Sequence, residues 1–422
     1  MTQENGFKET EIGLIPSGWE VSLLSDDTVA DLIMGQSPDS ATYNQTGDGV
    51  PFMQGKAEFG RVFPNPDKWC TAPSRLAEKN DILMSVRAPV GDVNIAPFKC
   101  AIGRGLAAIR AKDKTMPLYL FFYLIFAKKR LEDEGTGSIF KAINKGVLEN
   151  FKIALPEVGE QKNIVATLFQ VLQAIEQQEK IIEKTKELKR SLMHRLFTHG
   201  LRDEELKETE IGLMPESWNV ISIGDAYEFT TKPRGLDLSE YEELPFIPME
   251  LISENQRLLQ KYEMRKSFSS GTYVQKGDLV VAKITPSFEN GKQGIVTDIP
   301  LDFCYATTEV WPLHGKNDRS NINYLHYYLK KPDVRNEIAG KMEGSTGRQR
   351  VPKSVIAETK IPLPSYEEQL EINDIFISLD QKVEMNGSKM KNLQVLFRSM
   401  LQLLMTGQVR VKDIDFEGVA CE

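Results

Sequence analysis

The chain contains 422 residues, of which 41% are hydrophobic and 27% charged, and it carries a formal net charge of −8. This length exceeds what one ordinary hydrophobic core holds, so we expect two or more domains. The composition excludes a low-complexity chain, and no apolar run approaches the roughly 18 residues of a membrane helix. The negative charge argues weakly against a nucleic-acid partner, but a neutral module can still carry a basic face, so the question stays open.

The N-terminal residues, Met1–Asn5, contain no basic region and no apolar stretch, so we expect no secretory signal. Four cysteines are scattered without C-x-x-C spacing, which favours a reduced, cytoplasmic compartment. The four histidines form no zinc pattern with them, so we expect no metal and no cofactor on this chain. The cysteines are Cys70, Cys100, Cys304 and Cys421, and the histidines are His194, His199, His314 and His326.

A twelve-residue phrase occurs twice along the chain. "KETEIGLIPSGW" spans Lys8–Trp19 and "KETEIGLMPESW" spans Lys207–Trp218, 199 residues later and with nine of the twelve positions identical. Further along each half, "NDILMSVRAPVGD" (Asn80–Asp92) has a counterpart in "GDLVVAKITPSFE" (Gly277–Glu289). Both patterns predict a turn, a buried strand, and then a basic residue with a proline-broken loop. The two halves therefore contain the same elements in the same order.

The repeat continues with three shorter pairs of segments. An aromatic stretch is expected to be helical, a loop of small residues follows it, and a short strand then stops at a proline. The pairs are Pro117–Phe126 with Asn323–Lys331, Gly135–Ser138 with Gly344–Gly347, and Lys152–Pro156 with Lys360–Pro364. Each half thus predicts one α/β module.

After each module the apolar positions alternate between four- and three-residue spacing, which is the seam of a coiled coil. Each predicted helix has about 40 residues and is roughly 60 Å long at 1.5 Å per residue. Ser365 and Glu368 match a capping box at the start of the second helix, and Gly200 and Gly407 are expected to end the two helices. The seam positions are Ile164, Leu168, Val171, Ile175, Gln178, Ile182, Thr185, Lys189, Leu192 and Leu196, then Ile372, Phe376, Leu379, Val383, Asn386, Met390, Leu393, Phe397, Met400 and Leu404.

Each seam carries one amide near its middle, Gln178 in the first helix and Asn386 in the second. In an antiparallel pair the two middles would meet, and a buried amide there would fix the register. Alternatively, the amides reach solvent from a loosened seam. Each long helix could also pack on its own module, but the continuous seam in both copies favours pairing of the helices with each other.

We therefore predict an α+β fold in which two pseudo-twofold-related α/β domains are separated by two long antiparallel coiled-coil helices. The predicted boundaries are 1–155 and 207–363 for the α/β domains, 156–206 for the first helical region, and 364–422 for the second helical region with the C-terminal tail. In such an arrangement the first copy of the phrase would lie beside the end of the second helix. The phrase would occur twice because the same junction is built twice.

Several motifs, taken together and in order, resemble the specificity subunit of a type I restriction-modification enzyme. They are the "E-I-G-x-(I/M)-P-x-x-W" phrase, "G-Q-S-P" at Gly35–Pro38, the "(N/G)-D-(I/L)-(L/V)" strands, and "(I/L)-P-x-x-x-E-Q" at Leu155–Gln161 and Leu363–Gln369. The resemblance covers nearly all of the chain. It implies two target-recognition domains that each read one half of a bipartite sequence in double-stranded DNA, and helices that set the spacer between the halves.

The same resemblance implies partners. Two modification subunits would bind S-adenosylmethionine and methylate adenine N6, and restriction subunits with motor and nuclease activity would join them; no membrane partner is implied. The chain itself shows no Asn/Asp-Pro-Pro-aromatic tetrad and no glycine-rich cofactor loop after a strand, and "AIGRG" (Ala101–Gly105) fits neither phosphate-binding spacing. We therefore predict a non-catalytic subunit. The alternative is a coiled-coil adaptor whose end domains bind other proteins.

Base edges are read by Arg, Lys, Asn, Gln, Ser and Thr side chains, and glycines let the backbone approach a duplex. The first module offers Gln36, Ser37, Tyr43, Gln54, Lys56, Arg61, Arg87, Thr136, Ser138, Lys141, Asn144 and Lys145 as DNA-binding candidates. The second offers Thr231, Lys232, Arg234, Lys283, Thr285, Lys292, Ser345, Thr346, Arg348, Gln349 and Arg350. The loop "EGSTGRQRVPK" has the highest density of such groups, so we expect it to enter a DNA groove.

Overall fold

The computed structural model describes residues 6–135, 142–266, 270–316, 318–345 and 347–411. The chain divides into two compact units: unit 1 consists of Met1–Glu179 and Ser388–Glu422, and unit 2 consists of Lys180–Gly387. Each unit therefore combines one module with a segment of each long helix. Within the described residues, no helix combines the length and the apolar character that a membrane crossing requires.

The module of unit 1 contains two sheets and two smaller strand pairs. The four-stranded sheet has the order β10-β9-β12-β4 and the five-stranded sheet the order β5-β7-β6-β11-β8. Its strands are β1 (Phe7–Thr10), β2 (Gly13–Pro16), β3 (Glu20–Leu23), β4 (Ala30–Met34), β5 (Tyr43–Asn44), β6 (Val50–Met53), β7 (Trp69–Cys70), β8 (Leu76–Ala77), β9 (Ile82–Ser85), β10 (Val93–Ile95), β11 (Cys100–Ile102), β12 (Leu106–Ala111) and β13 (Lys152–Leu155). Its helices are α1 (Pro117–Phe126), α2 (Lys128–Glu134) and α3 (Lys145–Asn150).

The module of unit 2 repeats this plan. Its larger sheet has the order β17-β25-β22-β23-β19 and its smaller sheet the order β20-β18-β24-β21. Its strands are β14 (Leu206–Thr209), β15 (Gly212–Pro215), β16 (Asn219–Ser222), β17 (Tyr227–Phe229), β18 (Leu244–Ile247), β19 (Leu258–Leu259), β20 (Glu263–Arg265), β21 (Thr272–Gln275), β22 (Leu279–Ala282), β23 (Gln293–Val296), β24 (Phe303–Ala306), β25 (Val310–Gly315) and β26 (Lys360–Leu363). Its helices are α5 (Ile223–Ala226), α6 (Ile322–Tyr328), α7 (Pro332–Ala339) and α8 (Lys353–Glu358).

Strand pairing confirms the internal repeat. β9 pairs antiparallel with β12, and β22 pairs antiparallel with β25, while β6 runs parallel to β11 and β18 parallel to β24. The predicted strands Ile82–Ser85 and Leu279–Ala282 are buried along their whole length, as continuous runs of apolar residues in a covered strand should be.

Two long helices complete the fold, α4 (Val158–His199, 42 residues) and α9 (Tyr366–Met405, 40 residues). Every predicted seam position is buried or half-buried, which confirms the apolar stripe. In unit 1, Leu168 near the start of α4 shares a core cluster with Leu404 near the end of α9. In unit 2, Phe197 near the end of α4 stacks on Phe376 near the start of α9, with ring centroids 5.7 Å apart. The two helices are therefore antiparallel within each unit.

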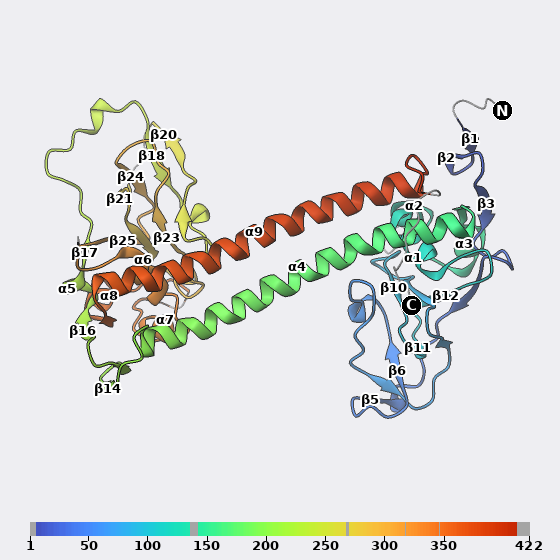
Figure 1. Ribbon diagram of the computed structural model, residues 1–422, viewed down its shortest axis with the longest axis horizontal. Helices are drawn as coiled ribbons and strands as arrows, with labels where there is room; N and C mark the ends of the chain where they lie inside the picture. The colour runs from blue at the N-terminus through green and yellow to red at the C-terminus, as the bar shows by residue number, and fades with distance from the viewer. Residues whose placement is uncertain (1–5, 136–141, 267–269, 317, 346, 412–422) are drawn as a thin grey trace. The chain divides into compact units, whose positions relative to one another are not determined.

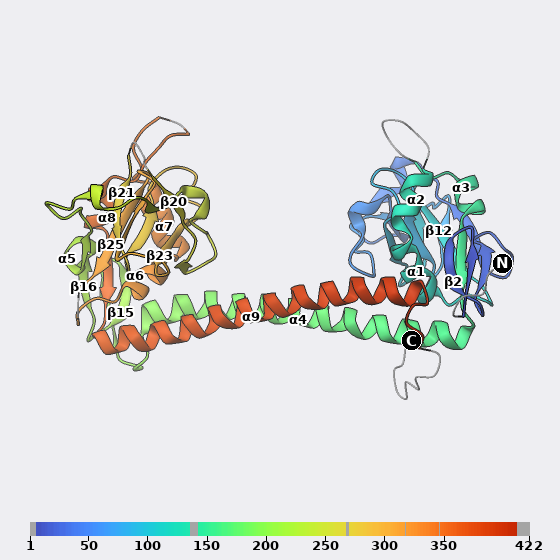
Figure 2. The same cartoon turned by 90° about the horizontal axis from the view of Figure 1, so that it is seen from above.

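The junction predicted from the repeated phrase is built twice, once in each unit. In unit 1 the buried Trp19 donates from Nε1 to Glu160 Oε2 (3.0 Å), and a Cβ at Gly407 would lie 2.2 Å from Pro16. The β1–β2 hairpin thus lies beside the end of α9 (Figure 1). In unit 2, Trp218 Nε1 donates to Glu368 Oε2 (3.1 Å), and a Cβ at Gly200, directly after α4, would lie 2.9 Å from the Trp218 ring. β15 thus lies beside the end of α4 (Figure 2).

The helix ends agree with the predicted signals except for one detail. Gly200 and Gly407 have φ of +64° and +66° and follow the last turns of α4 and α9, as left-handed C-terminal glycines do. At the start of α9, the Glu368 backbone N–H donates to Ser365 Oγ (3.2 Å). The Glu368 carboxylate, however, accepts from Trp218 and from the Leu201 N–H (2.9 Å). The expected reciprocal capping box is therefore only half formed, because the carboxylate closes the junction.

A buried glutamine joins each module to its long helix. Gln161 accepts from the Met116 N–H (2.9 Å) and donates to the Lys114 and Pro156 carbonyls (2.8 and 2.9 Å). Gln369 makes the same three bonds in unit 2, to the Asn321 N–H (2.7 Å) and to the Arg319 and Pro364 carbonyls (2.9 and 3.1 Å). The Glu-Gln pair of the repeated motif is thus a joint that holds the first turn of each long helix against its module.

Candidate DNA interface

In unit 1 the ends of several strands meet in one place, which we call edge 1 (residues 35–37, 54, 86–87, 103–105 and 142–144). The Gln36 N–H donates to the Ile102 carbonyl (3.0 Å), and the Gly103 N–H donates to the Met53 carbonyl (2.8 Å). The Val86 N–H donates to the Gly105 carbonyl (2.9 Å). These bonds tie together the segments that follow β4, β6, β9 and β11. Of the predicted residues, edge 1 gathers Gln36, Ser37, Gln54, Arg87 and Asn144.

Glycines allow this close approach of backbones at edge 1. A Cβ at Gly35 would lie 2.2 Å from the carbonyl oxygen of Gly103, and one at Gly105 would lie 2.5 Å from that of Gln54. Neither distance is compatible with a side chain. Next to these backbone contacts, Gln36, Gln54 and Arg87 are exposed. Edge 1 therefore exposes hydrogen-bond donors and acceptors above a closely packed backbone framework that contains glycines.

Arg104 is a further exposed cation at edge 1 that sequence reasoning missed. Its backbone N–H donates to Ser37 Oγ (3.2 Å), which holds the "GRG" turn against the "GQS" turn. In the sequence, "AIGRG" fits neither phosphate-binding spacing, and Arg104 is not among the predicted DNA-binding residues. The available signal was an arginine between glycines directly after a buried strand, which is where β11 ends.

Other predicted residues of the first module have partners inside the protein. Tyr43 donates to the Pro38 carbonyl (3.0 Å) and stacks on Phe52, and burial raises the pKa of its phenol. Lys56 pairs with Asp92 (2.6 Å).

The remaining three described candidates are also engaged. Arg61 pairs with Glu179 of α4, and Lys145 pairs with Glu149 of its own helix (3.1 Å). Asn144 caps α3 by accepting from the Val147 N–H (3.0 Å). Thr136, Ser138 and Lys141, and Thr346 of the second module, lie outside the described residues.

Unit 2 has the equivalent structure, edge 2 (residues 230–231, 283–285, 307–309 and 348–351). The Thr307 N–H donates to the Ile247 carbonyl (3.0 Å), and the Lys283 N–H donates to the Glu309 carbonyl (3.0 Å). The Thr285 N–H donates to the Gln349 carbonyl (3.0 Å). Edge 2 thus brings together Lys283, Thr285, Arg348, Gln349 and Arg350. The Thr230 N–H, next to Thr231, donates to the Pro312 carbonyl of β25 (3.1 Å). Thr308 and Glu309, at the positions of Arg104 and Gly105, were missed by sequence reasoning.

The late loop of edge 2 is partly neutralised by the protein itself. Arg350 donates to both carboxylate oxygens of Glu309 (2.8 Å each), and this pair lowers the pKa of Glu309. Lys283 lies over the Trp311 ring (4.2 Å to the centroid), and burial lowers the pKa of its ammonium group. Arg348 is exposed, and no ion pair engages it in the described part of the chain. Arg348 is therefore the cation of this loop that is placed to meet a ligand.

The other candidates of the second module, like Thr231 and Thr285 of edge 2, are either exposed or engaged within the protein. Thr231, Lys232 and Arg234 follow β17 and are exposed, as is Ser345. Lys292 is engaged within the protein, because its Nζ donates to the Met249 carbonyl (3.0 Å). Thr285 donates to Glu289 Oε1 (2.7 Å).

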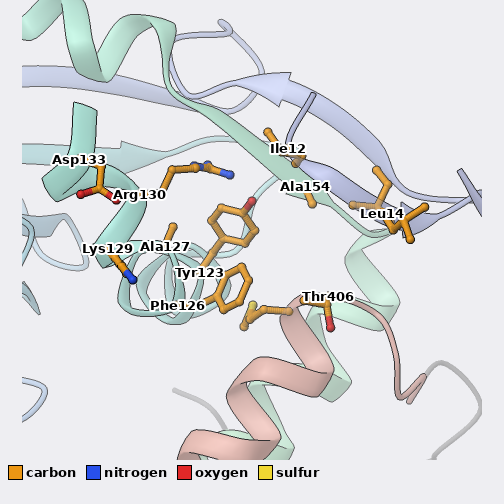
Figure 3. Close-up of a pocket in the computed structure, with 12 residues that line it drawn as sticks. Ile12, Leu14, Tyr123, Phe126, Ala127, Lys129, Arg130, Asp133, Ala154 and Thr406 are labelled. Carbon is orange, nitrogen blue, oxygen red and sulfur yellow. The ribbon is translucent and has the colours of Figure 1, made fainter. Parts of the chain in front are cut away.

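A second surface, which we call the hairpin surface, is repeated on both units. Leu14 in β2 and Leu213 in β15 occupy the same place in the repeated phrase and are 65% and 51% exposed. In unit 1 a pocket of about 370 Å³ opens beside the hairpin (Figure 3). Figure 3 shows Tyr123 and Phe126 of α1 facing Ile12 of the hairpin across it, with Lys129 and Arg130 at one side. A pocket of about 270 Å³ in unit 2 is lined by the equivalent Ile211 and Tyr328.

The chain is similar to known proteins over nearly its whole length. The family model described as the type I restriction modification DNA specificity domain matches residues 16–187 and again 215–394. A protein of Methanocaldococcus jannaschii described as a type I restriction enzyme MjaX specificity subunit is 47% identical over 201 residues, about half (47%) of each chain. The MjaVIII specificity subunit of the same organism is 24% identical over 436 residues, 98% of both chains.

Solved structures agree on the fold. The type I restriction-modification S subunit from M. genitalium is 17% identical, and the match covers 96% of this chain and 98% of that one with a TM-score of 0.61. A chain from a type I R-M system, solved to explain complex assembly and conformational transition, gives a TM-score of 0.57 at 17% identity and covers 94% and 99%. The predicted α+β class with two repeated domains and long helices is confirmed. Because the family model matches most of the chain, the chain belongs to the family of type I restriction-modification DNA specificity proteins.

Proposed function

We propose that the chain is the sequence-specific DNA-recognition subunit of a type I restriction-modification complex, in which edge 1 reads one half of a bipartite target and edge 2 the other. The observation that carries this proposal is that a similar backbone framework is built twice. Edge 1 is packed through glycines and edge 2 is joined by backbone hydrogen bonds, and each edge exposes different side chains. Family membership supports a non-catalytic role in recognition. We take 1–155 and 207–363 as the recognition domains and 156–206 and 364–422 as the helical regions that set the spacer.

The side chains of the two edges suit different base sequences. Edge 1 offers Arg87 and Arg104, which can donate in bidentate fashion to guanine, with Gln36 and Gln54, which can pair with adenine. Edge 2 instead offers Arg348 and the hydroxyls of threonines, and its Glu309 carboxylate already holds one arginine. Because the backbones below are alike, the difference in recognition lies in these side chains.

Replacing Arg87 and Arg104 together with alanine is expected to weaken binding of the assembled complex to its DNA target by about 2–6 kcal/mol, at about 1–3 kcal/mol per base contact. The measurement is equilibrium binding at one fixed salt concentration, because the contribution of phosphate contacts to the affinity changes strongly with salt. The K79A/K162A variant loses the same charge from exposed lysines of unit 1 outside edge 1, Lys79 in the turn before β9 and Lys162 in α4. Equal losses in both variants would mean that edge 1 contributes only charge.

We further propose that the hairpin surface docks the two modification subunits, which carry S-adenosylmethionine, and that restriction subunits join the assembly through them. A surface that appears twice suits a partner that binds twice, because two copies of one subunit need two like surfaces. The exposed leucine and the adjoining pocket provide the apolar anchor of such an interface. A subunit that reads the DNA of the cell acts in the cytoplasm, where we place it.

Replacing Leu14 with aspartate is expected to weaken the attachment of one modification subunit by about 2 kcal/mol or more, because a charge replaces an apolar anchor. Native mass spectrometry should then show complexes with one modification subunit where the unaltered chain carries two. L213D should remove the other modification subunit, and the double variant L14D/L213D should remove both. L188D, at an exposed leucine of α4, is the matched control and should leave the stoichiometry unchanged; a loss there would contradict docking at the hairpin surface.

A further inference from the structure

Three positions at the contact between module and long helices carry an ionic cluster in unit 2. Lys189 of α4 pairs with Asp380 of α9, and Asp380 Oδ2 also accepts from the Tyr327 hydroxyl of α6 (2.8 Å). The Lys189 ammonium lies 4.9 Å from the centroid of the Tyr327 ring. The side chains of Lys189 and Asp380 are only 22% and 32% exposed. The cluster therefore combines a half-buried cation, its counter-charge and a polarisable ring.

The same three positions are apolar in unit 1. Along the helices the repeat has an offset of 208 residues, so Phe397 stands where Lys189 does and Leu172 where Asp380 does. In α1, Phe122 takes the place of Tyr327, because Tyr119 and Tyr324, three residues earlier, make the same bond (2.8 Å) to the carbonyls of residues 154 and 362. The rings of Phe122 and Phe397 lie 6.1 Å apart. The positions of the three side chains are therefore repeated in the two units, whereas their polarity is not.

In each unit one member of these three positions, which we call the trio, comes from the other half of the chain. Unit 1 receives Phe397 from the second half, and unit 2 receives Lys189 from the first half. Two further pairs of equivalent positions do not distinguish the halves, since Leu196 and Leu404 are identical and Phe197 corresponds to Met405, all buried apolar side chains. At the three positions of the trio, the side chains of the two halves therefore differ in polarity.

A second copy of the same half would create a mismatch at either joint. If a second copy of the first half filled unit 1, Lys189 would lie against Phe122 and Leu172 with no carboxylate. If a second copy of the second half filled unit 2, Phe397 would replace Lys189 and leave Asp380 without its cation. Leaving a half-buried charge without its partner is unfavourable. Both like-with-like pairings are therefore penalised, and only the pairing of unlike halves satisfies both trios.

We propose that the Lys189–Asp380–Tyr327 cluster determines which halves pair, so that the two halves of the chain combine with each other and reject a second copy of the same half. Repeated halves with a shared apolar seam are otherwise prone to exchange between chains. A single charged position in an apolar seam is an established means of choosing a partner at some cost in stability. The consequence is a protein that always carries one copy of each edge.

The test splits the full chain after Asp203, in the exposed turn between the halves, and produces both parts together, so that all 422 residues are present. The first part is made with two different tags, and capture through one tag recovers either the second part or the other tagged first part. Unaltered parts should give unlike pairs at least tenfold over like pairs. Recovery of both kinds in equal amount, or of neither, would overturn the proposal.

Two variants should redirect the pairing in opposite ways. K189F should raise like pairs of the first part at least tenfold, because it supplies unit 1 with the aromatic ring it needs. F397K should raise like pairs of the second part, because the lysine meets Asp380. K186F and L396K place the same new side chains at exposed neighbouring positions and should change nothing. Like pairs that rise equally in the control variants would overturn the proposal.

The unsplit chain provides an independent measurement. F397K and L172D should each lower the thermal midpoint of unit 1, and the double variant should recover most of the loss, since it transfers the ion pair of unit 2 to the equivalent place. A double variant as unstable as the two single changes combined would mean that the two joints are not equivalent, and the proposal would fail on that ground.

Discussion

Replacing Glu160 with alanine is expected to lower the free energy of unfolding of unit 1 by about 3–5 kcal/mol. The Glu160 carboxylate is buried and accepts a hydrogen bond from Trp19 Nε1 (3.0 Å). It also accepts from both Nε and Nη2 of Arg410 (2.6 and 2.8 Å). Its loss leaves a buried indole N–H without an acceptor and removes the ion pair that holds the chain after α9. Hydrogen exchange followed by mass spectrometry should show faster exchange in the β1–β2 hairpin and the end of α9.

The matched variants separate the parts of this effect. E160Q keeps an acceptor for Trp19 but loses the charge pair with Arg410, so it should cost less than E160A. E368A removes the equivalent carboxylate of unit 2, which accepts from Trp218 and the Leu201 N–H, and should loosen unit 2 while unit 1 keeps its protection. Unchanged exchange in E160A would show that the hairpin is held by apolar contacts alone.

Lengthening both long helices by four residues is expected to lengthen the non-specific spacer of the DNA target by one or two base pairs and to leave both half-sites unchanged. The insertions follow Glu179 in α4 and Gly387 in α9, where the two units divide, so the content of each unit stays intact. Four residues add about 6 Å and turn the helix about 40° past a full turn, and base pairs are spaced by about 3.4 Å. Methylation mapping in cells that carry the variant measures the spacer.

Two controls define this result. Two-residue insertions at the same places rotate each seam by about 200°, turn its apolar positions to solvent, and should impair folding. Four residues inserted in α4 alone leave α9 too short to match and should reduce methylation. An active protein with the longer helices and an unchanged spacer would show that the helices do not set the distance between half-sites.

Features that depend on local pattern could be predicted from the sequence. The seam needs only the spacing of apolar side chains, and glycine at the end of a helix needs only its freedom at positive φ. The repeated phrase placed Trp19 at the end of the second helix, because a chain that repeats a motif builds the same contact twice. The local pattern predicts that the Glu368 carboxylate forms a cap, because its actual partner Trp218 lies 150 residues away along the chain.

The candidate interface could be predicted only in part, because it depends on which polar groups find partners in three dimensions. Arg350, Arg61 and Tyr43 looked like free surface groups, yet each is engaged by a residue distant along the chain or by a backbone carbonyl. Arg104 was missed because its importance comes from the meeting of strand ends that are far apart in sequence. The composition of the sequence identifies the loops that carry polar groups. The intramolecular partners of those groups determine which side chains remain available to bind DNA.

The division of the chain also sets an order of completion during translation. Unit 2 is one continuous stretch, Lys180–Gly387, whereas unit 1 needs Ser388 and the residues beyond it. At about 5–20 residues per second, the ribosome takes roughly 10–40 s to make the intervening stretch. Throughout that time the α4 face that carries Leu168 and Ile175 has no α9 to cover it. The half that is synthesised first is therefore the half that folds last, and its exposed apolar face is where a chaperone would bind the growing chain.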